Sequence, residues 1–179
     1  DAQADLEHAL INKLATVLLT VDYYKFFDSF DHRWVRDFLR MLHFPDALIE
    51  MLYDLYCNLK RTIKIGSAYG EAFITYNGMG QGDVATLFPA TALISGQFYM
   101  ISLAYPAVNK GACIDDRNFS GKLSDITGTY ELIARYDKEA GHILQPDKTS
   151  MSATDEKDRE TIQKMKLDGH TPKLKPHDV

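Results

Sequence analysis

Short apolar runs rich in β-branched residues alternate along this chain with segments in which apolar residues return every three or four positions. The run 16–21 is apolar and β-branched, which predicts a buried strand that ends at Asp22. Residues 112–114 and 117–119 flank the pair Asp115-Asp116. That pattern predicts an apolar strand, a tight turn and a second strand.

The positions between 31 and 76 predict two helices followed by a hairpin. Trp34, Phe38 and Leu42 recur every four residues, which predicts one apolar face on a helix from about residue 31 to 42. Pro45 suits the first turn of a second helix. Residues 61–66 and 71–76 then predict two strands joined by a turn at 67–70. The core-facing stripe of the second helix is expected to be Leu48, Met51, Leu52, Leu55, Tyr56 and Leu59.

The second half of the chain is expected to be mainly helical. A long helix is predicted over about 84–103, with Pro89 near its first turns. Another is predicted over about 124–140, weakened by Gly128 and ended by a glycine C-cap at Gly141. The charged stretch 155–166 predicts a short exposed helix, and only turn and tail signals follow Asp168.

Composition limits the class of protein. The 179 residues are 45% hydrophobic and 11% aromatic, as in a globular chain, and no apolar stretch reaches the ~18 residues of a membrane span. A net charge of −5 argues against a protein that grips nucleic acid with its whole surface. Cys57 and Cys113 form no paired motif, which favours a reducing, intracellular location, nuclear or cytoplasmic. Because the chain begins at Asp1, we expect it to be a piece of a longer protein.

Three carboxylates at predicted strand ends are the strongest chemical signal. Asp22, Asp115 and Asp116 would be costly to desolvate unless they were paired or bound a cation. Hard oxygen ligands of this kind are what Mg²⁺ prefers. The alternative is that Asp115-Asp116 is simply a polar hairpin turn, since Asp favours turns.

Two further segments are each weak signals alone. The cluster Gly78, Gly80 and Gly82 precedes a predicted helix, where glycines allow close backbone approach to an anion. The same cluster could be an ordinary turn. Lys148 follows a predicted Pro-Asp turn, and a lone lysine there is usually a solvated surface residue.

Taken in order, these segments resemble the motifs of reverse transcriptases, in the style of non-LTR retrotransposon and group II intron enzymes. Residues 22–30 resemble the first motif of the palm, 78–83 the second, which opens a helix, 113–116 the third, with its paired Asp, and 140–149 the fourth, with its Lys-Thr. The four motifs cover most of residues 16–151.

The resemblance implies an α/β (α+β) palm fold, with a ferredoxin-like antiparallel sheet backed by helices. It implies a palm over residues 1–154, with remnants of the fingers at the N-terminal end and around 45–76. Residues 155–179 would connect to a missing thumb. The partners implied are an RNA template, a DNA primer, dNTP and the missing fingers and thumb, with no membrane.

The resemblance also assigns roles in two-metal nucleotidyl transfer. Asp22 and Asp115 would bind two Mg²⁺ ions, with Mn²⁺ as a substitute, and Asp116 would support them. One ion would activate the primer 3′-hydroxyl and the other would stabilise the pyrophosphate leaving group. Lys148 would protonate that leaving group as a general acid.

Four other positions are implied to contact substrate. Phe27 matches the place where a bulky ring lies under the incoming sugar and excludes a 2′-hydroxyl; the alternative is a buried core ring. Gln81 and Gly82 match positions along the nascent base pair, and Tyr23 belongs to the same substrate-binding set.

The sequence departs from the family at three places. Cys113 replaces an aromatic residue, residues 84–87 replace the usual Pro-Leu-Ser-Pro, and Phe26 replaces a small residue. A catalytically decayed scaffold that binds RNA or protein therefore remains an alternative. An RNA-dependent RNA polymerase is a second one, although Ile114 stands where such enzymes have Gly.

Several polar residues receive no single role. Asp28, Asp31 and Asp83 could support the ligands, cap helices or lie on the surface. His142, His170 and His177 form no metal set and are expected at the surface.

Overall fold

The computed structural model describes residues 2–12, 14–167 and 169–175, which form two compact units. Unit 1 comprises Asp1–Tyr24 and Leu93–Val179, and unit 2 comprises Lys25–Ala92. Unit 1 contains a five-stranded sheet, and unit 2 contains two helices and a β-ribbon. The expected division at residue 154 stays a prediction.

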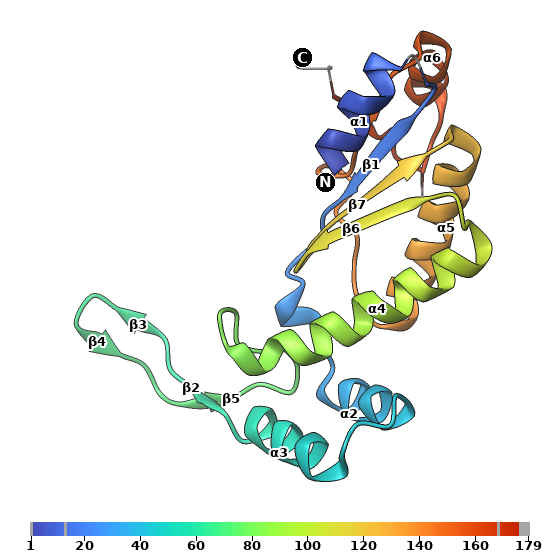
Figure 1. Ribbon diagram of the computed structural model, residues 1–179. Coiled ribbons are helices and arrows are strands. Elements are labelled where there is room, and N and C mark those ends of the chain that lie inside the picture. Colours follow the sequence, from blue (N-terminus) through green and yellow to red (C-terminus); the bar gives the residue numbers. More distant parts are fainter. Residues whose placement is uncertain (1, 13, 168, 176–179) are drawn as a thin grey trace. The chain divides into compact units, whose positions relative to one another are not determined.

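The sheet of unit 1 has the strand order β6-β7-β1-β8-β9 (Figure 1). Neighbouring strands run antiparallel, except that β8 and β9 are parallel. The predicted strand at 16–21 and the predicted strand-turn-strand around Asp115 are both confirmed. The strands are β1 (Val17–Val21), β6 (Asn109–Cys113), β7 (Asp116–Gly121), β8 (Ser150–Ala153) and β9 (Lys173–Leu174).

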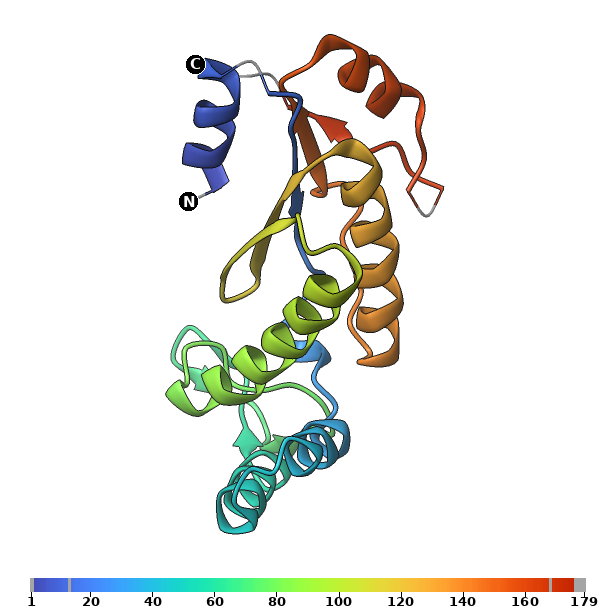
Figure 2. The ribbon, with the colours of Figure 1, turned by 45° about the vertical axis from the view of Figure 1, so that its right-hand side comes forward.

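One face of this sheet carries the core. Val17, Leu19 and Val21 alternate along β1 and are fully buried. The register pairs Leu19 with Phe119, and the ring of Phe119 meets that of Phe98 edge to face at 5.8 Å. Phe98 belongs to α4 (Leu87–Ala104), and α5 (Leu123–Glu139) packs nearby, while α1 (Ala2–Ile11) lies on the other side of the sheet (Figure 2). The expected class, an α+β protein with a mainly antiparallel sheet backed by helices, is therefore confirmed.

Two elements of the sheet were missed by the sequence patterns. All of β8 is buried, but Ser150 and Ser152 alternate with its apolar residues and disguise a central strand. The strand β9 corrects the expectation that only turns and tail follow Asp168.

The predicted charged helix is confirmed as α6 (Glu156–Lys164), capped by Asp155. His177 lies outside the described residues.

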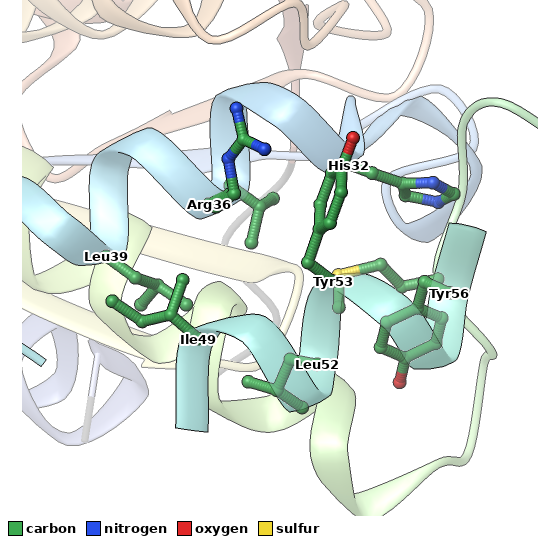
Figure 3. Close-up of a pocket in the computed structure, with 9 residues that line it drawn as sticks. His32, Arg36, Leu39, Ile49, Leu52, Tyr53 and Tyr56 are labelled. Carbon is green, nitrogen blue, oxygen red and sulfur yellow. The ribbon is translucent and has the colours of Figure 1, made fainter. Parts of the chain in front are cut away.

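The packing of the helices of unit 2 confirms the expected buried faces only in part. The pair α2 (His32–Met41) and α3 (Asp46–Cys57) buries His32, Val35 and Leu39 against Ile49, Leu52 and Tyr56 (Figure 3). The apolar residues of α2 gather on one side, whereas α3 carries apolar residues around much of its circumference, so only tertiary packing selects the buried face of α3. The space left between them is about 10 Å³, room for no more than one water. Of the stripe expected to face the core, Leu52 and Tyr56 are buried as predicted, whereas Leu48, Met51, Leu55 and Leu59 are partly or largely exposed. Trp34, Phe38 and Leu42, the predicted apolar face of the preceding helix, are also partly exposed.

A hairpin follows α3, with its turn displaced from the predicted position. The turn lies at Gly66 and Ser67, between β3 (Lys64–Ile65) and β4 (Ala68–Tyr69). Gly66 has φ +63°, a left-handed conformation that glycine adopts at little cost, and this fixes the turn there. At the base of the hairpin, β2 (Lys60–Arg61) pairs with β5 (Phe73–Ile74).

The helix α4 corrects one expectation from composition. Together with the preceding turn, η2 (Val84–Thr86), it forms a helical segment of 21 residues that contains an 18-residue window with a mean hydropathy of 1.4, long and apolar enough to cross a membrane. The expectation that no stretch reaches the length of a membrane span is therefore wrong by length and composition. The core helix of a folded protein has the same composition, and Gln97 on α4 is fully buried with its amide bonded to Asp137.

Gly128 in α5 has a packing role. Tyr105, just beyond α4, lies so close that a Cβ on Gly128 would stand 2.0 Å from its hydroxyl oxygen. The glycine that weakened the helix prediction thus permits close approach of a ring. The helix ends as expected, with Gly141 at φ +79°.

Gly128→Ala is expected to lower the free energy of unfolding by about 1–3 kcal/mol, because the Tyr105 ring must move. This expected decrease is the net change: it already includes the ~1 kcal/mol by which alanine stabilises a helix relative to glycine. Urea unfolding measures the change. Gly111→Ala is the matched control, since its Cβ would meet nothing within 4 Å. A similar small change in both variants would contradict the packing role.

Candidate active site

Asp22 and Lys148 lie together at the end of β1. The Nζ of Lys148 is 3.1 Å from Oδ2 of Asp22, and the other carboxylate oxygen accepts the backbone N–H of Tyr23 at 2.6 Å. The backbone holds this arrangement, because the N–H of Gln145 donates to the carbonyl of Asp22 at 2.9 Å. The turn that presents Lys148 is thereby fixed beside Asp22. The structure brings the first and fourth sequence motifs together.

The Asp pair lies on the neighbouring strand. The turn of this hairpin is Ile114–Asp115, so Asp116 is the first residue of β7 and not part of the turn. Val21 pairs with Arg117, which places Asp22 and Asp116 one residue beyond, opposite each other and on the same face. Ile114 has φ +59°, a conformation that a β-branched residue adopts only under strain.

The carboxylates fit Mg²⁺ by donor type, although they are not gathered into a complete site. Asp22 and Asp116 supply hard oxygen donors from adjacent strand ends. Across residues 2–12, 14–167 and 169–175, no three His, Cys, Asp or Glu side chains lie close enough to hold a metal ion. Asp22 is paired with the ammonium of Lys148, a monovalent cation at the place where a metal is expected.

A buried polar network lies behind these strand ends. Arg117, which follows Asp116, donates through Nη1 to the Tyr23 hydroxyl at 2.6 Å and to Oε1 of Gln97 at 2.7 Å. The same Nη1 lies 3.3 Å from Oδ1 of Asp137. The Tyr23 hydroxyl and the Gln97 amide both donate to the other Asp137 oxygen, at 2.7 and 3.1 Å. The network therefore joins β7, the end of β1, α4 and α5.

This network is fully enclosed. Arg117 and Asp137 are 0% exposed and Tyr23 is 4% exposed. Burial raises the pKa of the Tyr23 hydroxyl well above its ordinary value, and Arg117 opposes that shift. Burial likewise raises the pKa of Asp137, against the positive charge of Arg117. The Tyr23 ring lies in the protein interior. The expected contact of Tyr23 with substrate stays a prediction.

The sequence contained a signal for this network that was not used. Arg117 alternates with Phe119 on the inward face of β7. Asp137 continues the buried stripe of α5 that includes Ile126, Tyr130 and Ile133. A cation and a carboxylate in two inward positions each require a buried partner.

His142 corrects another expectation. The sequence predicts a surface position, but His142 is only 4% exposed. Its ring contacts the Tyr23 ring edge on, with the ring centres 6.4 Å apart. Burial, with a smaller contribution from Arg117, lowers the pKa of His142 to about 4. The folded chain therefore holds this imidazole neutral at physiological pH. His170 is exposed, as expected.

The other predicted substrate residues lie in unit 2, so their distance from Asp22 stays a prediction. Phe27, at the start of η1 (Phe27–Ser29), is half-buried and contacts Phe26 edge to face. Its carbonyl accepts the N–H of Met79 at 2.8 Å, and the carbonyl of Phe30 accepts that of Gly78 at 2.8 Å. The structure thus joins the second half of the first motif to the glycine cluster.

The glycine cluster has clear local constraints. Gly78 has φ +93°, and a Cβ there would lie 3.2 Å from the backbone of Asp28. Gly82 has φ +86°, while Gln81 and Gly82 are both exposed. Asp83 caps η2 and accepts the Tyr56 hydroxyl at 2.8 Å.

Asp31 likewise caps a helix. It accepts the N–H groups of Arg33 and Trp34 at the start of α2. For Asp31 and Asp83, the open choice between cap, surface and supporting residue is therefore decided in favour of caps.

Removing one partner of the buried ion pair is expected to be costly. Arg117→Met should lower the free energy of unfolding by about 3–5 kcal/mol, because Asp137 is left buried and uncompensated. The double variant Arg117→Met, Asp137→Leu should lose less than the sum of the two single variants. Chemical denaturation of the four proteins measures this coupling.

The exposed pair Arg40–Glu50 is the matched control for that cycle. Arg40→Met and Glu50→Gln should each change stability by less than about 1 kcal/mol. Additive losses at Arg117 and Asp137 would contradict a coupled network.

The depressed pKa of His142 predicts a loss of stability in acid. A neutral imidazole contributes stability above the unfolded-state pKa of about 6.5, and this contribution is lost as pH falls towards 4. Between pH 7 and 4.5 the wild type should lose about 2–3 kcal/mol more than His142→Phe. Urea unfolding at the two pH values measures the difference. His170→Phe should behave as wild type, and a His142→Phe protein with the same pH dependence as wild type would contradict the assignment.

Comparisons with known proteins give a fold and no closer relationship. No protein-family model matches the sequence, and no curated protein matches it. Solved structures do match: telomerase from Candida tropicalis in complex with the TWJ fragment of telomeric RNA has a TM-score of 0.64 and 12% identity. The alignment covers 84% of this chain and 28% of that one.

A second structure gives the same result. Apo telomerase from Candida tropicalis, truncated from its C-terminal domain, has a TM-score of 0.59 and 13% identity, covering 84% of this chain and 34% of the other. The chain therefore spans between about a quarter and a third of the length of these two telomerase chains. At such low identity the likeness concerns the fold alone, and the chain has a reverse-transcriptase-like fold.

Proposed function

We propose that this chain is the palm of an RNA-directed DNA polymerase of the retroelement type. It would add deoxynucleotides from dNTP to a DNA primer on an RNA template. The observation that carries the proposal is the register that sets Asp22 opposite Asp116 of the neighbouring hairpin, with Lys148 paired to Asp22. The presence of telomeric RNA in one telomerase structure supports a nucleic-acid partner.

Asp22, Asp115 and Asp116 would hold two Mg²⁺ ions, or Mn²⁺ in their place. When bound, such ions activate the attacking hydroxyl and stabilise the leaving oxygen. For this, Asp22 must give up its ion pair with Lys148. Lys148 is 60% exposed and has a flexible stem, so it would then be available to donate a proton to the pyrophosphate.

The remaining residues would position the nucleotide. Phe27 would lie under the sugar and exclude a 2′-hydroxyl, while the exposed Gln81 and Gly82 would line the nascent base pair. For Tyr23 we propose a supporting role instead of substrate contact. Its buried hydroxyl bonds to Asp137 and Arg117, which fixes the backbone next to Asp22.

Further segments of a longer protein would complete the enzyme. Fingers would supply contacts to the triphosphate and a thumb would hold the primer. The proposed location of the protein is intracellular, in the nucleus or the cytoplasm.

A second function is favoured by two observations. The described carboxylates form no three-residue metal cluster, and Asp22 is paired with Lys148. Both features also suit a decayed reverse-transcriptase-like module that serves as a scaffold for RNA or protein.

Mn²⁺ binding to the chain, followed by calorimetry or water-proton relaxation, separates the two functions. The wild type should bind Mn²⁺, and Asp22→Asn with Asp115→Asn should weaken binding at least about tenfold, because two anionic ligands are lost. Lys148→Met should strengthen binding about two- to fivefold, because an exposed ion pair of under ~1 kcal/mol no longer competes for Asp22.

The control variant is Glu139→Gln with Glu160→Gln, two exposed carboxylates outside the motifs, and it should bind as wild type. In a longer protein that includes fingers and thumb, Asp22→Asn with Asp115→Asn should also lower the incorporation of dNTP into a primer on an RNA template, whereas the control variant should not. If the wild type bound Mn²⁺ no better than the double Asp variant, even with primer-template and dNTP present, the polymerase proposal would be wrong and the scaffold favoured.

A further inference from the structure

The β-ribbon of unit 2, residues 60–76, is exposed along its length. Figure 1 shows β3 and β4 at the end of a two-stranded ribbon that leads away from α2 and α3. Its two short ladders are joined by irregular backbone, and such an isolated ribbon is only marginally stable in water. Large apolar side chains lie exposed on both its strands: Ile63, Ile65, Tyr69, Phe73, Ile74 and Tyr76. A patch of this kind marks an interaction site.

The charge of the ribbon is opposite to that of the chain. It carries Lys60, Arg61 and Lys64 against the single acid Glu71, whereas the whole chain has a net charge of −5. All three cations lie on the outgoing strand. Lys60, Lys64 and Glu71 are exposed, and Arg61 is half-buried with one N–H donated to the carbonyl of Gly78.

The register places each cation beside an apolar side chain. Arg61 pairs with Phe73, and Lys64 pairs with Tyr69, whose ring centre is 5.3 Å from the ammonium. Tyr69 and Tyr76 are 67% and 86% exposed. The ribbon thus presents Lys60 and Lys64 on its outgoing strand and the aromatic side chains of Tyr69, Phe73 and Tyr76 on its returning segment.

This combination matches one class of partner. Cations contact the phosphates of a single strand while aromatic rings stack on its unpaired bases. We propose that the ribbon is a docking site for an unpaired stretch of RNA. The choice of RNA rests on the proposed function, but the site is separate from the carboxylates and needs no metal.

A protein partner fits the ribbon less well. An apolar protein face that covered the isoleucines would also bury Lys60 and Lys64, and those ammonium groups would need carboxylates of their own. The phosphates of RNA neutralise cations wherever they lie along the strand. The charge of the ribbon therefore favours RNA.

Fluorescence anisotropy with a labelled single-stranded oligoribonucleotide tests this across a range of salt concentrations. Lys60→Gln with Lys64→Gln should make the negative slope of log affinity against log salt shallower by about 1.4, since two phosphate contacts are lost. Tyr69→Ala with Tyr76→Ala should weaken binding by about tenfold or more with the slope unchanged, because stacking is lost and charge is kept.

Two controls keep the outcomes apart. Lys157→Gln with Lys164→Gln removes equal charge from the exposed face of α6 and should leave the affinity as in wild type. Asp22→Asn with Asp115→Asn should also bind RNA as wild type, so loss of the metal site and loss of the ribbon site are distinguishable. Circular dichroism confirms that each variant is folded.

Two results would overturn the proposal. One is unchanged RNA affinity in both ribbon variants. The other is self-association of the chain that is lost in Tyr69→Ala with Tyr76→Ala while the RNA affinity of that variant is unchanged. That result would make the ribbon a protein interface.

Discussion

The buried contact between Arg117 and Asp137 is the constraint on which the carboxylate end of unit 1 depends. Each charge would be expensive to bury alone, and the two are held together with Tyr23 and Gln97 in one hydrogen-bonded set. Arg117 adjoins Asp116 and Tyr23 adjoins Asp22, so a single network fixes the backbone at both strand ends. The exposed carboxylates owe their positions to polar groups that solvent never reaches.

Patterns of local origin were the ones that the sequence could predict. The strand before Asp22, the hairpin at Asp115 and the helix ending at Gly141 follow from β-branched runs, turn residues and a glycine cap. The buried face of α3 followed only in part, because apolar residues surround this helix and the choice between its faces is tertiary. The strand β8 was missed for a related reason, since its two serines are buried only in the sheet that forms around them.

The candidate site divides in the same way. The proximity of Lys148 to Asp22 was predicted in outline, because both belong to ordered motifs. The supporting network was not predicted, since Gln97, Arg117 and Asp137 belong to three different elements and no motif joins them. Unit 2 collects Phe27 and the glycine cluster through backbone hydrogen bonds, so the unit boundary falls inside the first motif.

Charge at the strand ends favours a cation there. Arg117 and Asp137 neutralise each other, so the network adds no net charge behind the site. In front of it, Asp22 and Asp116 lie on adjacent strand ends, Asp115 lies in the turn, and the ammonium of Lys148 pairs with Asp22, so these four side chains carry a formal excess of two negative charges. Like charges on adjacent strand ends repel, and an exposed lysine offsets little of that repulsion because solvent screens it. A divalent cation would balance the excess and bind several oxygens at once, which one ammonium cannot do. On the proposed function, the pairing of Lys148 with Asp22 would be the arrangement of this site before a metal ion binds.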